Sequence, residues 1–322
     1  MKAFVTGGTG FVGAHLVQQL LADGVAVTCL VRSPAKAAAL GWRDVEIIRG
    51  DMSDRRALAQ GCAGADVIFH VAGLIVARDL DHFMSANRDA TGTLLDVAAA
   101  QPPRRFVYVS SQAAGGPNQP GRPREESEPP HPVSDYGRSK LAGELLVRAS
   151  GLPWTIVRPP VVYGEWDHEV LKVFKMARLG LAPVFGDGSQ QISVIYAGDL
   201  ARALATAATT PAAAGHVYFA AHPQATTTRD LVLAVGRALQ KKPVVIPIPT
   251  ALARGVLAAI GSLARMAGRA TLLSADKANE FLAPGWVCSS AALTRDTGWR
   301  AEVDLDSGLK RTADWYRTHG WL

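Results

Sequence analysis

A glycine-rich segment lies between the first apolar run of the chain and its first helix-like stretch. Residues 6–13 read TGGTGFVG, directly after the strand-like run 3–6 and at the start of the Ala/Leu-rich stretch 14–22. Glycines let a backbone turn tightly and approach a pyrophosphate, which the free N–H groups and the dipole of a helix N-terminus then stabilise. A glycine pattern in this position predicts a dinucleotide-binding βαβ unit at the start of the chain.

The first half of the chain alternates short apolar runs with helical stretches. This alternation is typical of βαβ units around a parallel sheet whose two faces are covered by helices. The expected strands are Ala3–Thr6, Val25–Val31, Val45–Ile48, Asp66–Val71, Phe106–Ser110, Thr155–Val157 and His216–Ala220. We therefore expect an α/β fold, a Rossmann-type doubly wound parallel sheet formed by residues 1–162 and 194–221.

The remaining segments look more irregular. Residues 163–193 and 222–322 are expected to form a smaller C-terminal substrate-binding domain. Segment 113–133 is rich in glycine and proline, which disfavour regular structure, so it is expected to be one long loop.

Composition narrows the functional classes. With 48% hydrophobic and 19% charged residues in 322, the chain should form a globular core. The net charge of +6 comes without a dense Lys/Arg run or zinc-module spacing, so neither nucleic-acid binding nor a metal site is expected. The glycine loop begins too early for a signal peptide, and no run of about 18 apolar residues occurs. Cys29, Cys62 and Cys288 are interpreted as reduced thiols. We expect a cytoplasmic protein without a transmembrane segment.

A tyrosine and a lysine four residues apart, Tyr136 and Lys140, would lie on one face of a helix. A free tyrosine has a pKa of about 10 and exchanges protons poorly at neutral pH. A neighbouring ammonium favours the phenolate and brings the hydroxyl closer to useful acid–base strength. Ser111 follows the expected strand 106–110 and could direct its hydroxyl at the same point, with the adjacent Ser110 as the alternative. The pattern therefore indicates a proton-transfer site.

In this order, the glycine loop, the serine and the YxxxK pair resemble the extended short-chain dehydrogenases/reductases, also called the NAD-dependent epimerase/dehydratase family. The GxxGxxG spacing of residues 7–13 is part of the resemblance, which extends over nearly the whole chain. The resemblance implies a nicotinamide dinucleotide cofactor and Tyr136 as the general acid/base. It also implies that Lys140 lowers the pKa of Tyr136 and holds the nicotinamide ribose, while Ser111 polarises the substrate oxygen.

The end of the second expected strand indicates which form of the cofactor is used. An acidic residue there would bind the adenosine ribose and select NAD. Arg32 takes that position and Lys36 follows one turn later, so two positive charges could bind a 2′-phosphate. We expect NADP(H) to be favoured over NAD(H).

Further segments resemble cofactor-flanking motifs of the family. Two of these segments follow the third and fourth expected strands. The others are the helix motif that contains Asn87 and the RPPVVYG segment 158–164. Asn87 is expected to brace the central strands, with a surface asparagine as the alternative. The full set of expected cofactor-binding residues is Thr6, Gly7, Gly10, Phe11, Val12, Gly13, Arg32, Lys36, Asp51, Met52, Val71, Ala72, Gly73, Asn87, Ser110, Tyr136, Lys140, Pro159 and Val162.

The expected substrate pocket departs from that of sugar-nucleotide enzymes. In the resembling family such members carry GDGxxxRDF, whose arginine binds the sugar-nucleotide pyrophosphate. Residues 186–194 read GDGSQQISV, with Ile192 in the arginine position. An aliphatic side chain cannot neutralise a diphosphate, although Arg178 or another arginine could substitute. The departure weighs against a nucleotide sugar.

Segment 250–269 repeats apolar residues at helical spacing, with Arg254, Arg265 and Arg269 on another face. Such a helix would cover an apolar pocket, lie on a membrane surface or pack on the domain core. Together with Arg32, it makes the chain resemble the hydroxysteroid dehydrogenase and dihydroflavonol reductase branch more than the sugar epimerases.

The expected activity is therefore reversible reduction of a ketone or aldehyde to an alcohol on a small, hydrophobic molecule. An epimerase or dehydratase that retains NAD is one alternative. A non-catalytic NADP-binding scaffold or sensor is another, against which the intact Ser111, Tyr136 and Lys140 argue. Because the family often forms dimers through a helix bundle, a homodimer is among the expected states, as is peripheral membrane contact.

Overall fold

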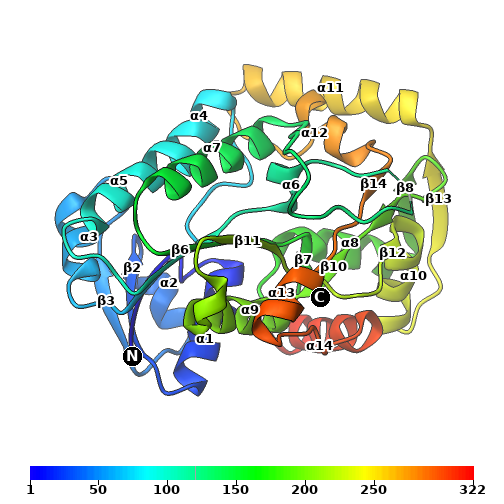
Figure 1. Cartoon of the computed structure of the whole chain (residues 1–322). Coiled ribbons are helices and arrows are strands. Elements are labelled where there is room, and N and C mark those ends of the chain that lie inside the picture. The colour runs from blue at the N-terminus through cyan, green and yellow to red at the C-terminus, as the bar shows by residue number, and fades with distance from the viewer. Residues whose placement is uncertain (120) are drawn as a thin grey trace.

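The computed structural model describes residues 1–119 and 121–322, and in these ranges a parallel sheet of seven strands forms the centre (Figure 1). Along the sheet the order is β3, β2, β1, β4, β5, β6 and β11, and neighbouring strands all pair in parallel. The strands are β1 (Lys2–Thr6), β2 (Ala26–Val31), β3 (Val45–Arg49), β4 (Val67–His70), β5 (Arg105–Val109), β6 (Trp154–Arg158) and β11 (His216–Phe219). The expected Rossmann-type, doubly wound fold is confirmed.

Helices surround this sheet and form much of the remaining chain. They are α1 (Phe11–Ala22), α2 (Pro34–Ala39), α3 (Arg55–Cys62), α4 (Leu80–Met84), α5 (Ala90–Ala98), α6 (Gln112–Gly115), α7 (Asp135–Ala149), α8 (His168–Arg178), α9 (Ala197–Thr209), α10 (Thr228–Ala238), α11 (Thr250–Met266), α12 (Ala275–Phe281), α13 (Ala291–Thr297) and α14 (Leu305–Thr318), with a π-helical turn at Ser85–Asp89 and a 3-10 turn at Pro211–Ala213.

Shorter strands pair outside the central sheet. They are β7 (Val161–Tyr163) with β10 (Val194–Tyr196), β8 (Leu181–Phe185) with β13 (Val244–Ile248), and β9 (Gln191–Ile192) with β12 (Thr226–Thr227) and β14 (Gly285–Trp286). The chain returns from this region to the central sheet at β11, which pairs with β6. The division into a nucleotide-binding and a substrate-binding part stays a prediction.

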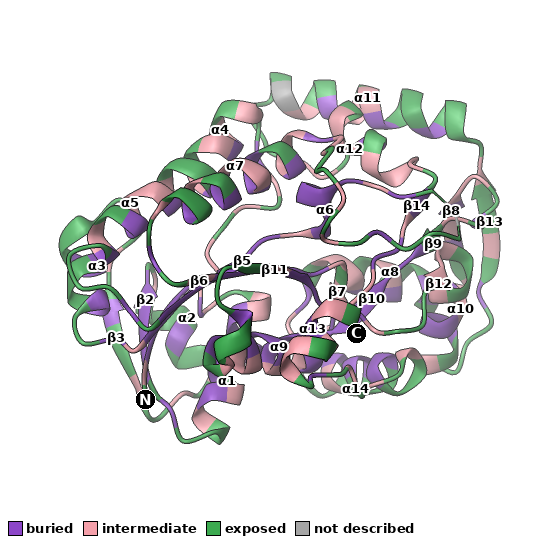
Figure 2. Ribbon diagram, in the orientation of Figure 1, coloured by how far each residue is buried: buried purple, intermediate pink, exposed green. Residues whose placement is uncertain are grey.

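Successive residues of β1 point into two different hydrophobic cores. Ala3 and Val5 pack in one core with α1 and α9, whereas Phe4 packs in the other with α3, α5 and α7. Figure 2 shows the buried central strands between these layers of helices. Because both faces of the sheet are covered, its strands are almost wholly apolar, as the sequence indicated.

Two expectations about irregular segments were wrong. Residues 113–115, expected in the long loop, belong to α6, because the Ser111 hydroxyl caps this helix by accepting from the Ala113 N–H at 3.1 Å. Residues 222–322 are mostly helical rather than irregular, because α10 and α14 each bury an apolar face with α8 in a third core.

Some expected features of the whole chain can be compared with the described residues. Cys29, Cys62 and Cys288 are free and buried, so the expected reduced thiols are confirmed. Within the described ranges, no helix is long and apolar enough to cross a bilayer.

Candidate active site

The turn after β1 requires glycine. Gly7 has φ +75°, and a Cβ built there would lie 2.5 Å from the backbone nitrogen of Ala72. A Cβ at Gly13 would overlap the Gly7 carbonyl oxygen. The absence of side chains therefore lets α1 begin directly behind the turn and lets the turn contact the segment after β4. The structure thus brings together two of the expected cofactor segments, 7–13 and 71–73.

The beginning of α1 fits a bound dinucleotide. Its N-cap is Gly10, which has no side chain to accept from the first-turn N–H groups, and no acidic residue lies in that turn. The amides of Phe11, Val12 and Gly13 precede the first intrahelical hydrogen bond, from Ala14 to the Gly10 carbonyl at 2.8 Å. Free amides at a helix N-terminus bind phosphate, so the residues present fit the pyrophosphate of NAD(P).

A buried hydrogen-bond chain connects β1, β4 and α5 behind the loop. The Thr6 hydroxyl lies 2.7 Å from His70 Nδ1, and His70 Nε2 lies 2.9 Å from the Thr91 hydroxyl. Burial, aided by the positive charge of Lys140, lowers the pKa of His70 to about 3. The ring is therefore neutral, and Thr6 uses its hydroxyl inside the protein to hold the strand ends together.

Basic and acidic residues meet where β2 and β3 end. Arg32 and Lys36 are exposed, at the end of β2 and on α2. Hydrogen bonds from Ser53 lower the pKa of the exposed Asp51 carboxyl, and the charge of Arg32 lowers it further. In the part of the chain that the structure describes, Arg32 makes no ion pair. Its guanidinium is thus available to an adenosine phosphate, near Asp51 and Met52.

Asn87 clamps the loop after β4 to the helix of the YxxxK pair. Its carboxamide oxygen accepts from the Leu74 N–H at 2.8 Å, while its nitrogen donates to the Leu74 carbonyl and to the Ser139 hydroxyl, both at 2.9 Å. Asn87 is buried in the π-helical turn 85–89, a local distortion often found at functional sites. It therefore positions Gly73 beside α7 and is not a surface residue.

Ser111, Tyr136 and Lys140 gather at the carboxyl end of β5. Burial raises the pKa of Tyr136 to about 12; a hydrogen bond with Ser111 lowers it, and the charge of Glu280 raises it further. Lys140 donates to the Val109 carbonyl at 2.8 Å, and burial lowers its pKa to about 7 against the opposing effect of Glu144. Tyr136 is thus a neutral phenol at neutral pH and carries the proton that a general acid needs. The expected lowering of its pKa by Lys140 stays a prediction.

A buried ion pair supports this constellation and was missed by the sequence analysis. Glu144 accepts two hydrogen bonds from Arg158, at 2.8 and 2.7 Å, and one from the Ser110 hydroxyl at 2.6 Å. Both charged side chains are almost fully buried, Glu144 on α7 and Arg158 at the end of β6. The pair fixes α7 to the strand ends and engages Ser110, which leaves Ser111 as the serine beside Tyr136. The one available signal was the position of Glu144, one helical turn after Lys140.

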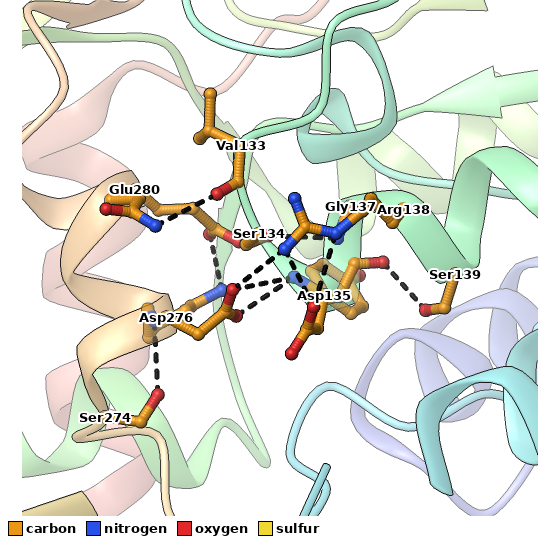
Figure 3. Close-up of polar contacts among 12 residues, drawn as sticks. Val133, Ser134, Asp135, Gly137, Arg138, Ser139, Ser274, Asp276 and Glu280 are labelled. Carbon is orange, nitrogen blue, oxygen red and sulfur yellow. Dashed lines mark hydrogen bonds and ion pairs between the residues drawn. The ribbon is translucent and has the colours of Figure 1, made fainter. Parts of the chain in front are cut away.

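The short helix α12 docks on the N-terminus of α7 (Figure 3). Asp276 accepts from the Asp135 N–H at 3.0 Å and from Arg138 at 3.2 Å, and Glu280 accepts from the Ser134 hydroxyl. Lys277 lies over the Tyr136 ring, with its nitrogen 4.9 Å from the ring centre. A segment near the C-terminus therefore helps to position Tyr136, although Asp135 and Asp276 are 141 residues apart in the sequence.

A cavity of about 170 Å³ opens beside Tyr136. Apolar side chains from the segment before α4 and from α4 line it, together with the segment between α11 and α12. The larger apolar members are Ile75, Leu80, Phe83 and Leu272. Three basic and three acidic side chains also line the cavity: Arg78, Arg269, Lys277, Asp79, Asp135 and Asp276. The cavity is therefore amphipathic, with the tyrosine on its wall.

Other expected residues have the following positions. Val12, Val71 and Val162 pack against the core that contains Ala3 and Val5 of β1. Pro159 is buried, and its carbonyl accepts from the Gln112 N–H at 2.8 Å. Ile192 is buried in the third core, so its position serves packing in this chain. Arg178 is exposed at the end of α8.

The segment expected to be a helix over 250–269 is α11, which ends at Met266. Leu257 is buried, but Leu252, Val256, Leu263 and Met266 are exposed, so its apolar residues do not share one buried face. Gly261 and Arg269 line the cavity, so the segment covers the pocket. The side chain of Arg265 lies outside the described part of the structure.

Comparisons with known proteins agree with this geometry. The model of the NAD dependent epimerase/dehydratase family matches residues 3–221. The chain is 34% identical to the ceramide reductase of Caulobacter vibrioides, covering 99% of this chain and 95% of the relative. It is 29% identical to a 2-alkyl-3-oxoalkanoate reductase of Stenotrophomonas maltophilia, covering 97% and 98%.

Among solved structures, the UDP-glucuronic acid 4-epimerase from Bacillus cereus has a TM-score of 0.81 at 21% identity. The match covers 99% of this chain and 100% of that chain and shows a shared fold. The expected family is confirmed: the chain belongs to the NAD-dependent epimerase/dehydratase family, the extended short-chain dehydrogenases/reductases, and is an NAD(P)-dependent enzyme.

Proposed function

We propose that this protein is an NADPH-dependent reductase that converts a ketone on an apolar molecule to an alcohol. The observation that carries the proposal is the position of Tyr136 on the wall of an amphipathic cavity to which Ile75, Phe83 and Leu272 contribute apolar side chains. The relatives named as reductases of ceramide and of 2-alkyl-3-oxoalkanoates support it, because both names denote molecules with apolar alkyl chains.

The residues divide the chemistry between them. A nicotinamide bound beyond the glycine loop would supply the hydride. The Ser111 hydroxyl donates a hydrogen bond to the substrate carbonyl oxygen, and Tyr136 transfers its proton to that oxygen as the alcohol forms. A phenol whose pKa is about 12 keeps its proton at neutral pH, so Tyr136 holds the proton that formation of the alcohol requires. Lys140, charged in part near its pKa of about 7, stabilises the phenolate that remains.

A direct assay compares substrate classes. The purified enzyme is mixed with NADPH and either ethyl 3-oxohexadecanoate or UDP-glucose, and the absorbance of the reduced nicotinamide is followed. The proposal predicts consumption of NADPH with the oxoester and no epimerised sugar with UDP-glucose. Epimerised sugar together with tightly retained NAD would contradict it.

A nucleotide-sugar epimerase is a second candidate because two arginines, Arg78 and Arg269, line the cavity. Guanidinium groups bind diphosphates well. Against this, the position at which the family's sugar enzymes carry their arginine is here the buried Ile192. The reductase therefore remains the proposed function, and the assay above separates the two.

The proposed preference for NADPH predicts a large effect of Arg32→Asp. This change removes an exposed guanidinium next to Asp51 and introduces a charge that repels a 2′-phosphate. The ratio of kcat/KM for NADPH to that for NADH should fall by about tenfold or more, since a charged hydrogen bond contributes roughly 1.5–3 kcal/mol. The matched control is Arg104→Asp, which reverses an exposed charge just before the amino end of β5, the end opposite to the cofactor site. It should leave the ratio unchanged. An unchanged ratio in Arg32→Asp would remove the basis of the preference.

A further inference from the structure

The helix α11 has two apolar faces, and one of them is exposed. Ala253, Leu257 and Gly261 are buried toward the molecule, where Gly261 allows close contact because a Cβ there would lie 2.9 Å from Ser274 Cα. On the outside, Leu252, Val256, Leu263 and Met266 follow one another at spacings of three, four or seven residues, which places them in one stripe. Their exposed fractions run from 46% for Val256 to 84% for Met266.

Further exposed apolar residues lie just before and just after α11 in the chain. Val244 and Ile246 of β13 are 67% and 40% exposed, and Leu273, just after α11, is 42% exposed. Figure 1 shows α11 along the edge of the molecule, outside α12, with β13 at one end of it, and Figure 2 shows its exposed outer face. We call the residues Val244, Ile246, Leu252, Val256, Leu263, Met266 and Leu273 the α11 surface. Apolar side chains concentrated on one face mark an interaction site.

The charge of the chain is concentrated in the same segment. Residues 231–275 contain six Lys or Arg residues and no Asp or Glu. Because the whole chain has 34 basic and 28 acidic residues, the remainder holds 28 of each, and the net charge of +6 belongs to this segment. Arg237 pairs with Asp306 at 2.7 Å, whereas Lys241, Lys242, Arg254 and Arg269 have no acidic partner among the described residues.

This combination identifies the chemistry of the occupant. Apolar side chains flanked by Lys and Arg, without acidic residues, are the pattern of a helix that lies in the interface of an anionic bilayer. A second copy of the chain would oppose the same positive segment to itself, which disfavours a dimer through this face. The acidic residues on the neighbouring α12, Asp276 and Glu280, are engaged with Arg138 and Lys277.

The inner side of the same segment closes the cavity. Gly261, Arg269 and Leu272 line the cavity that contains Tyr136, while Leu263 and Met266 are exposed on the outside. We propose that the α11 surface binds an anionic lipid bilayer and that the substrate is a membrane lipid bearing a ketone, which enters the cavity at α11. The part that concerns the substrate rests on the proposed reductase function, whereas the bilayer binding does not.

Flotation of the full-length protein with vesicles tests the binding. Vesicles of phosphatidylcholine mixed equally with phosphatidylglycerol should carry the protein upward at low salt, whereas pure phosphatidylcholine or high salt should weaken binding by roughly tenfold or more. Leu263→Asp combined with Met266→Asp should abolish flotation, and Lys241→Gln combined with Lys242→Gln should reduce it by roughly tenfold. Leu145→Asp, an apolar residue 57% exposed on α7, is the matched control and should float normally.

The alternatives give different results. Equal flotation of wild type and the Leu263/Met266 double variant, or no flotation at all, would overturn the bilayer proposal. If the α11 surface joins two copies instead, light scattering will show a wild-type dimer that the double variant converts to a monomer without any vesicle binding.

Turnover separates the substrate part from the reductase proposal. The Leu263/Met266 double variant should reduce water-soluble ethyl 3-oxobutanoate like wild type but reduce vesicle-borne ethyl 3-oxohexadecanoate at least tenfold more slowly. Equal losses on both substrates, or none on either, would contradict delivery through the bilayer. If wild type reduces neither ketone, the reductase proposal fails, while flotation still decides whether the α11 surface binds lipid.

Discussion

Replacing Tyr136 with Phe should lower kcat for ketone reduction by about a thousandfold, since positioned general acids typically contribute 10²- to 10⁴-fold. The ring would keep its packing beside Phe83 and Lys277, so only the proton donor is lost. Affinity for NADPH, measured by fluorescence titration, should fall far less than kcat, because Tyr136 is one of many expected cofactor contacts and the glycine loop and Arg32 are untouched. Single-turnover kinetics with ethyl 3-oxohexadecanoate would measure the loss at the chemical step.

Tyr218→Phe is the matched control for this change. Tyr218 is also a buried tyrosine, but it lies on β11 and donates to Asp296 at 2.9 Å, away from the cavity. Its variant should keep wild-type turnover. If Tyr136→Phe turned over as fast as the control, Tyr136 would not be the proton donor, and a non-catalytic role for the cofactor site would regain support.

The second large effect concerns stability. Arg158→Met should lower the free energy of unfolding by about 3 kcal/mol, because the fully buried carboxylate of Glu144 loses its bidentate partner and keeps only Ser110 and the more exposed Arg148, 3.5 Å away. Urea denaturation followed by circular dichroism measures this change. Lys172→Met breaks an exposed ion pair with Glu169 and serves as the control, with an expected change below about 1 kcal/mol.

The double variant tests the physical reason. Replacing Glu144 with Leu in the Arg158→Met background removes a buried charge that only the more exposed Arg148 still pairs with, so part of the lost stability should return. Additive losses from the two substitutions would show that packing, rather than an uncompensated charge, explains the single variant. In the double variant the Ser110 hydroxyl also loses its acceptor, Glu144, which limits the recovery of stability.

The sequence was sufficient to predict the elements whose signals are local. The glycines at 7 and 13 encode a turn in which a side chain would clash with the backbone, and β-branched runs define strands buried on both sides. The order of glycine loop, Ser111 and YxxxK also placed the candidate site at the carboxyl ends of the strands. These features depend on residues close together in the chain or on a fixed strand order.

Features that depend on distant contacts could not be predicted in this way. Nothing local in the sequence pairs Glu144 with Arg158, because the two charges meet only when β6 and α7 pack together and bury them. The contact of α12 with Ser134 and Asp135 joins residues more than 130 positions apart, and no periodic pattern encodes it. The second apolar face of α11 was hidden because helical spacing alone does not say which apolar residues face the core.

Transfer of deuterium from labelled NADPH tests the central claim most directly. NADPH carrying deuterium at the transferable position of the nicotinamide is incubated with the enzyme and ethyl 3-oxohexadecanoate, and the alcohol is analysed by mass spectrometry. A net reductase predicts one deuterium at the new carbinol carbon, and Tyr136→Phe should form the same labelled alcohol about a thousandfold more slowly. An alcohol without deuterium, or no alcohol together with UDP-glucose epimerised by retained cofactor, would contradict the account.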